Sequence, residues 1–210
     1  MPRIRKPVRV TTVLNWLESH WKEWWWRSVG FEAADKITKE SSEFGTKVHL
    51  LIEGILTEEV NINIESEVSE EQCAIAVVLW LEQNKVTPAI NDNYKDSLEV
   101  KVEDAKLNLI GHFDYIAKID GVVYIIDFKT SNKMRKSFPL QKAAYAKMCG
   151  IYANAGITIR SHWNKETNKV DFEVATYPDL KPYWKVFKAA LDCYKYFNYT
   201  EKQYNLKRFK

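Results

Sequence analysis

Long apolar runs are the first feature that this sequence lacks. None of its segments reaches the roughly 18 consecutive apolar residues that a transmembrane helix requires, so no association with membranes is predicted. The basic start, residues 1–10, is not followed by the apolar stretch of a secretory signal peptide. We therefore expect a cytoplasmic protein.

Cysteine is also scarce. The three residues Cys73, Cys149 and Cys193 are far apart, and none stands at the short spacing by which paired cysteines hold a metal. The pattern argues against a paired-cysteine metal site and fits a reducing intracellular setting. We expect all three thiols to be buried as small apolar side chains.

The sequence does have enough apolar residues for a substantial core. Its 210 residues are 46% hydrophobic and 13% aromatic, which predicts one folded domain of the α/β or mixed α+β class. We divide this domain into an N-terminal helical region (1–40), a core (41–177) and a C-terminal helix with a basic tail (178–210).

Charge is distributed unevenly along the chain. The net charge is +3, but residues 1–10 hold four basic residues and no acid, and residues 181–210 hold eight basic residues against two acids. The middle of the chain is therefore acidic on balance. Basic ends around an acidic centre suit a protein that binds cations centrally and phosphates at its periphery, while basic ends that serve only solubility are the alternative.

Apolar periodicity predicts the secondary structure. Helices are expected over about 13–27, 41–56, 69–85, 139–154 and 183–197, and strands over about 62–64, 97–104, 156–163 and 170–177. Residues 21–26 include four tryptophans, too many for one face of a helix. We expect most of them in the core and one or two exposed, where they would suit base stacking with single-stranded DNA.

The segment 110–131 predicts a β-hairpin with charged residues at its open end. Asp120-Gly121 is suited to a two-residue type I′ turn between two apolar runs. With that turn, Asp114 lies opposite Asp127, and side-chain alternation puts Lys129 on the same face. Two opposed carboxylates repel each other, so we expect a cation between them.

Oxygen ligands of this kind favour Mg²⁺ or Mn²⁺ over zinc. With Lys129 beside Asp114 and Asp127, such a site suits phosphodiester hydrolysis, because a lysine can orient the attacking water or stabilise developing negative charge. The alternative is a purely structural salt bridge between Lys129 and one of the aspartates.

Four short motifs in order extend this interpretation. They are GxxxH (Gly45–His49), GHFD (Gly111–Asp114), DFKT (Asp127–Thr130) and QxxxY (Gln141–Tyr145). Together they resemble the PD-(D/E)XK nucleases of the RecB-type exonuclease branch. The resemblance implies a restriction-endonuclease-like αβββαβ core, with a central mixed sheet flanked by helices.

The resemblance also implies roles for individual residues. Lys129 would be the catalytic lysine, and one or two Mg²⁺ or Mn²⁺ ions would be held by His49, Asp114, Asp127 and the backbone carbonyl of Phe128. The implied DNA-binding residues are Gln141, Tyr145, Thr130, Ser131, Lys133 and Arg135. Glu53 and Glu99 are second-tier candidates.

Some members of this branch hold an iron–sulfur cluster with four cysteines, which three scattered cysteines cannot do. The chain is more similar to the members without a cluster, the mitochondrial genome maintenance exonucleases and their phage and bacterial relatives. The implied activity is metal-dependent exonucleolytic hydrolysis of DNA, with single-stranded ends preferred, in replication, repair or recombination. A structure-specific or restriction-like endonuclease and a catalytically silent DNA-binding subunit are the alternatives.

Overall fold

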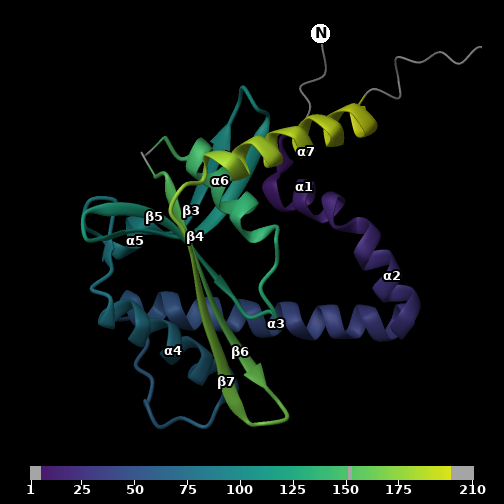
Figure 1. Cartoon of the computed structure of the whole chain (residues 1–210). Helices are drawn as coiled ribbons and strands as arrows, with labels where there is room; N and C mark the ends of the chain where they lie inside the picture. The colour runs from purple at the N-terminus through teal and green to yellow at the C-terminus, as the bar shows by residue number, and fades with distance from the viewer. Residues whose placement is uncertain (1–5, 151–152, 200–210) are drawn as a thin grey trace, which may run out of the picture.

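The computed structural model describes residues 6–150 and 153–199 and is organised around one mixed sheet with helices on both faces (Figure 1). The helices are α1 (Val10–Leu17), α2 (Ser19–Val29), α3 (Phe31–Leu56), α4 (Ser69–Gln83), α5 (Tyr94–Ser97), α6 (Phe138–Met148) and α7 (Lys181–Tyr199). The strands are β1 (Val8–Arg9), β2 (Thr87–Pro88), β3 (Leu98–Asp104), β4 (Leu109–Ile119), β5 (Val122–Lys129), β6 (Ala155–Asn164) and β7 (Lys169–Tyr177).

Over the described residues the sheet has seven strands, and β4 is the strand with the most neighbours. One edge of β4 pairs with β3 and then β2, and the other edge pairs with β1 and then β5. β5 and β6 are parallel and are joined through α6, whereas β6 and β7 are antiparallel. The predicted α/β class, a mixed sheet flanked by helices, is confirmed.

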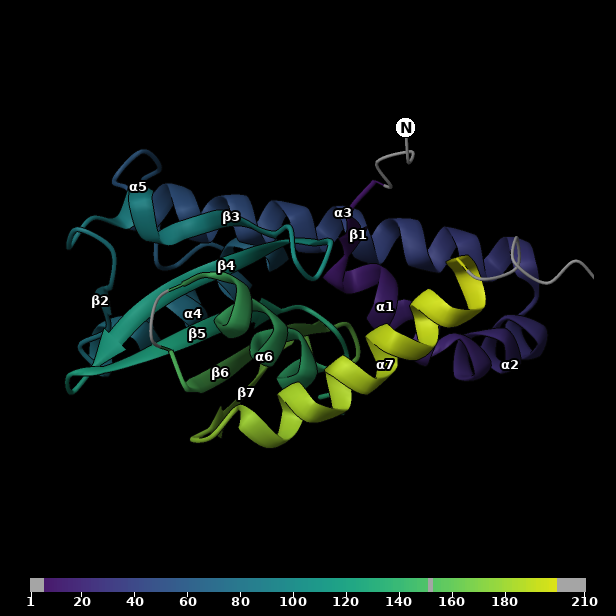
Figure 2. The same cartoon turned by 90° about the horizontal axis from the view of Figure 1, so that it is seen from above.

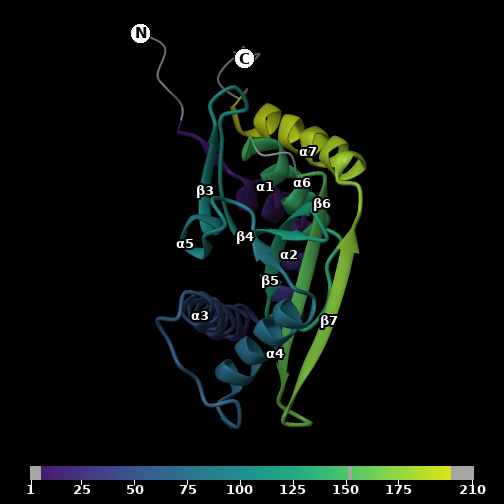
Figure 3. The ribbon, with the colours of Figure 1, turned by 90° about the vertical axis from the view of Figure 1, so that its left-hand side faces the viewer.

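Each face of the sheet has its own apolar core. On one face the buried side chains of α1, α6 and α7 pack on the sheet, with Phe113 and Ile125 among the sheet residues. On the other face α3 and α4 pack on the sheet, with Tyr115 and Phe128 among the sheet residues. The two layers of helices lie on opposite sides of the strands in Figure 3.

The predicted hairpin is confirmed. Asp120 and Gly121 have φ angles of 50° and 78°, as a type I′ turn requires. The backbone pairing runs from Ile119–Val122 to Tyr115–Ile126, which is the predicted register. This hairpin brings the residues that precede Tyr115 close to those that follow Ile126.

The N-terminal helices differ from their predicted bounds. The expected helix over 13–27 is two helices that meet at Glu18, and the helix expected from residue 41 begins at Phe31, directly after Gly30 with its φ of 86°. Residues 31–40 lack glycine and proline, and the ion pair between Lys36 and Glu40 supports them one turn apart. α3 therefore extends well beyond the sheet, and α2 meets it at that end and leads away at an angle (Figure 2).

Other expectations are wrong in instructive ways. No strand forms over 62–64, where Ile64 is exposed and no neighbouring strand pairs with it. Of the tryptophans of α2 whose side chains the structure describes, Trp24 and Trp26 are exposed and Trp25 is half-buried. The physical reason is that α2 lies at the end of α3 that extends beyond the sheet, so these side chains do not reach the core of the sheet.

The three thiols are less uniform than predicted, because Cys73 is buried, Cys149 half-buried and Cys193 exposed on α7. Half of the basic residues of the two ends, those at 1–5 and 200–210, lie outside the described residues. Over the part of the chain that the structure describes, no helix combines the length and apolar character needed to cross a bilayer.

Candidate metal centre

His49 reaches the sheet from α3 because that helix approaches β5 closely. Gly45, one turn earlier, makes the approach possible, since a Cβ atom there would lie 3.0 Å from the Thr130 Oγ1 atom. The His49 Nε2–H donates to the backbone carbonyl of Phe128 at 3.2 Å. That hydrogen bond fixes the ring so that Nδ1 faces away from Phe128, toward β3 and β4.

Glu99 and Asp114 lie opposite each other on β3 and β4, between the pairs Leu98–Tyr115 and Val100–Phe113. Glu99 has a φ of 49°, a left-handed backbone that is unusual for a residue with a side chain. Both strands change faces there, because Leu98 and Tyr115 belong to one core while Phe113 and Val100 belong to the other. Phe113 and Tyr115, two residues apart on β4, therefore point to opposite faces of the sheet.

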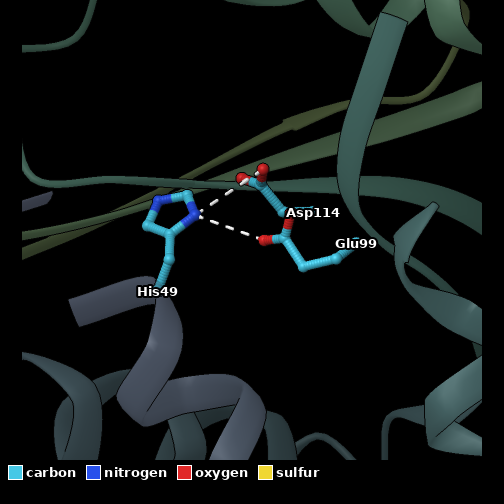
Figure 4. Close-up of side chains that lie close together, drawn as sticks. All are labelled: His49, Glu99 and Asp114. Atoms are coloured by element: carbon cyan, nitrogen blue, oxygen red, sulfur yellow. Dashed lines mark ion pairs between the residues drawn. The ribbon is translucent and has the colours of Figure 1, made fainter. Parts of the chain in front are cut away.

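These three side chains converge (Figure 4). The His49 Nδ1 atom lies 3.6 Å from a Glu99 carboxylate oxygen and 3.7 Å from an Asp114 oxygen. One ligand atom from each of the three residues lies within 4.8 Å of the other two. The group borders a cavity of about 600 Å³, whose wall is a face of α3 completed by Glu99, His112 and Thr130.

Electrostatics favour a cation at this group. Burial alone would lower the pKa of His49, but the Asp114 and Glu99 carboxylates outweigh it and raise the pKa to about 9. Burial raises the pKa of Asp114, and the neighbouring Asp127 adds to that rise while His49 opposes it. In the absence of another cation, a protonated His49 therefore compensates the two carboxylates.

Asp127 is held differently from Asp114. It is fully buried, and its two oxygens accept from the ammonium groups of Lys129 at 2.6 Å and Lys142 at 3.1 Å. Burial would raise the pKa of Asp127, but these two lysines outweigh it and lower the pKa. Lys129 shows the reciprocal effect, since the aspartates outweigh its burial and raise its pKa.

We expected one face of the hairpin to hold Asp114, Asp127 and Lys129, and this expectation is only partly correct. Asp127 and Lys129 do share a face, but Asp114 meets His49 of α3, whereas Asp127 meets Lys142 of α6 on the opposite side of the sheet. The reason is that β4 changes faces next to Asp114. There the Asp114 Oδ2 atom accepts from the Phe128 N–H at 2.7 Å. Asp114 lies one residue, and Phe128 two residues, beyond the last backbone pair, Tyr115–Ile126.

Lys142 is the residue of this region that sequence reasoning missed. It is completely buried on α6, and its ammonium also donates to the Phe138 carbonyl at 3.2 Å. Burial lowers the pKa of Lys142 to about 8, against the raising effect of Asp127. A signal was present, because Phe138, Lys142 and Tyr145 recur at helical spacing and so predict one buried stripe.

The other predicted DNA-binding residues lie around this region. Gln141 donates to the Tyr145 hydroxyl at 3.1 Å, and the Tyr145 ring is buried against Gly111 and Phe113. Arg135 is paired with Glu18 at 3.6 Å. Thr130 and Glu53 line the cavity, Ser131 donates to the Lys133 carbonyl, and Lys133 itself is exposed. Their contacts with DNA stay predictions.

The donor set suits a divalent cation such as Mg²⁺ or Mn²⁺, with one imidazole nitrogen and two carboxylates around one position. Glu99, a second-tier candidate from the sequence, belongs to this group, and Asp127 does not. The Phe128 carbonyl accepts from His49, and its role as a direct metal ligand stays a prediction. Asp127 as a ligand stays a prediction.

Comparisons with known proteins add little to this geometry. The sequence matches no protein-family model and no curated protein. Among solved structures, one described as "Crystal structure of SSO0001" aligns over 93% of this chain and 79% of its own, with 14% identity and a TM-score of 0.41. A similarity this loose supports no conclusion on fold or function.

Proposed function

We propose that this protein is a divalent-metal-dependent deoxyribonuclease that hydrolyses phosphodiester bonds at the His49–Glu99–Asp114 group. The observation that supports it best is the convergence of these three ligand atoms within 4.8 Å, beside an open cavity and next to a buried lysine–aspartate pair. If α4, β2 and α5 are taken as insertions between α3 and β3, the order α3–β3–β4–β5–α6–β6 is compatible with the αβββαβ core implied by the motifs.

The residues would divide the work as follows. His49, Glu99 and Asp114 would hold Mg²⁺ or Mn²⁺, which when bound polarises a phosphate oxygen and acidifies a water. Asp127 holds the Lys129 ammonium 2.6 Å away, and Lys129 would stabilise the negative charge that develops on the phosphate. The Phe128 carbonyl keeps the His49 ring oriented.

The substrate we propose is single-stranded DNA, cut from an end. Trp24 and Trp26 are 65% and 37% exposed, and exposed indoles stack on unpaired bases of any sequence. They lie on α2, beside the end of α3 that extends beyond the sheet, so a strand bound along α3 could reach both the indoles and the cavity.

The test uses end-labelled single-stranded, double-stranded and circular DNA, each incubated with Mg²⁺, with Mn²⁺ and with EDTA. We expect degradation of linear single strands that EDTA abolishes, and no cutting of circles. Cutting of circular DNA would support the endonuclease alternative instead. Binding of DNA without hydrolysis under any metal would contradict nuclease activity altogether.

The site assignment needs its own variants. Lys129→Ala should abolish hydrolysis, because it removes the cation next to the reacting phosphate. Lys101→Ala is the matched control, since Lys101 is an exposed lysine on the neighbouring strand β3. Full activity in Lys129→Ala would show that the chemistry takes place elsewhere.

A further inference from the structure

Lys142 occupies a site shaped for its side chain. A Cβ atom on Gly156 of β6 would lie 2.8 Å from the Lys142 Cδ atom and 3.2 Å from its Cβ atom, so the absence of a side chain at 156 makes room for the lysine stem. The ammonium lies 5.8 Å from the Phe138 ring centroid and 5.6 Å from that of Tyr177. The space beside Gly156 and the two aromatic rings thus form a specific buried site for the Lys142 side chain.

Lys142 adds a positive charge beyond the one needed to neutralise Asp127. Asp127 is already paired with Lys129 at 2.6 Å, so one carboxylate lies between two ammonium groups. This trio has a net charge of +1 when all three groups are ionised. It adjoins the His49–Glu99–Asp114 group, since the Asp114 oxygen accepts from the backbone next to Asp127.

An extra buried cation has opposite effects on the two ligands of the proposed reaction. It repels a divalent cation and attracts a phosphodiester anion, and burial weakens the screening of both effects. It also keeps Asp127 turned toward the lysines, because the carboxylate accepts from an ammonium with each of its two oxygens. Both carboxylate oxygens of Asp127 are therefore occupied by ammonium groups.

We propose that Lys142 is a positioning residue that holds the Asp127 carboxylate on Lys129. Through its buried charge, Lys142 lowers the affinity of the site for the metal and raises its affinity for the phosphate backbone of the substrate. This inference rests on the proposed function. It assigns to Lys142 an effect that packing alone would not produce, since the two affinities move in opposite directions.

The experiment compares Lys142→Met with Lys147→Met, an exposed lysine on the same helix. Mn²⁺ binding is measured without DNA by the loss of the free-ion paramagnetic resonance signal, and KM for single-stranded DNA is measured at saturating Mn²⁺. In Lys142→Met we expect Mn²⁺ to bind about tenfold more tightly and KM to rise about tenfold, for removal of one buried charge. Lys147→Met should change neither quantity.

Each other outcome has a defined meaning. Equal or weaker Mn²⁺ binding in Lys142→Met, while the wild-type protein binds Mn²⁺, overturns this inference and leaves the proposed function intact. Absence of Mn²⁺ binding in both proteins overturns the proposed metal centre, and this inference with it. Lys142→Gln, which keeps a hydrogen-bond donor, gives the same comparison if the methionine variant does not fold.

Discussion

At the scale of single residues, Glu99 is the most informative position. Its carboxylate completes the group with His49 and Asp114, so Glu99→Gln should weaken Mn²⁺ binding by at least about tenfold and reduce hydrolysis in parallel. Isothermal titration with Mn²⁺ and a nuclease assay measure the two effects.

The matched control is Glu103→Gln, which removes an exposed carboxylate from the same strand. Its Mn²⁺ affinity should equal that of the wild-type protein. An unchanged affinity in Glu99→Gln would mean that Asp127 takes the place of Glu99 as a ligand, as the sequence motifs imply.

The pKa of His49 makes metal binding depend on pH. Protons compete with the metal below a pKa of about 9, so the association constant for Mn²⁺ should rise by about tenfold per pH unit from pH 7 and level off above 9. Competition titrations in non-chelating buffers between pH 7 and 9.5 measure the slope. A flat profile would show that His49 is not a ligand.

The same pKa affects the metal-free protein. The pKa of His49 is raised on folding from 6.5, so its contribution to the free energy of unfolding is fully present below about pH 6.5 and is lost as pH rises through about 9. Urea denaturation of the wild-type protein and of His49→Asn, each at pH 6 and pH 9.5, measures this contribution. An equal change in the free energy of unfolding between the two pH values in both proteins would contradict a contribution from His49.

What the sequence could not predict at this scale depends on contacts between distant segments. The left-handed backbone at Glu99 arises where β3 pairs with β4, and strand alternation alone does not predict it. Lys142 is buried because Gly156 leaves room for its side chain on a strand that follows later in the chain. Local periodicity contains neither piece of information.

At the scale of elements, the contact between β4 and α6 depends on Gly111. A Cβ atom there would lie 2.5 Å from the Tyr145 Cε1 atom, so Gly111→Ala should lower the free energy of unfolding by about 1–3 kcal/mol through overpacking. Urea denaturation measures the loss. In a double-mutant cycle, Gly111→Ala should lower the free energy of unfolding by less when Tyr145→Leu has already shortened the opposing side chain. Strictly additive losses of the two substitutions would contradict the contact.

The elements themselves were predictable where a local signal existed. The hairpin register followed from Asp120-Gly121, whose backbone suits one turn type, and α4 followed from its apolar run. The start of α3 was missed because Gly30 was not recognised as the break between two helices. The strand expected near Ile64 failed because alternation alone does not supply a neighbouring strand.

At the scale of the whole molecule, the exposed tryptophans lie well away from the metal centre. Replacing Trp24 and Trp26 by alanine should raise KM for single-stranded DNA by about tenfold with little change in kcat, because stacking contributes roughly 1–3 kcal/mol per base. Phe172→Ala on β7 is the control, with a ring of similar exposure to Trp26. Steady-state kinetics measure KM and kcat of both variants. An unchanged KM in the double tryptophan variant would show that the DNA strand does not contact α2.

The candidate metal centre also connects parts of the fold that are far apart in the chain. His49 comes from α3 on one face, and Glu99 and Asp114 come from two strands of the sheet, so a bound ion would join the helix to the sheet (Figure 4). A ligand that binds only the folded state stabilises it by about 2.7 kcal/mol at a hundredfold excess over its Kd.

Mn²⁺ should therefore raise the midpoint of thermal unfolding in the wild-type protein, as followed by circular dichroism. His49→Asn should show no such rise, while Lys142→Met should show a larger rise than the wild type at subsaturating Mn²⁺. An equal rise in all three proteins would mean that the ion binds elsewhere.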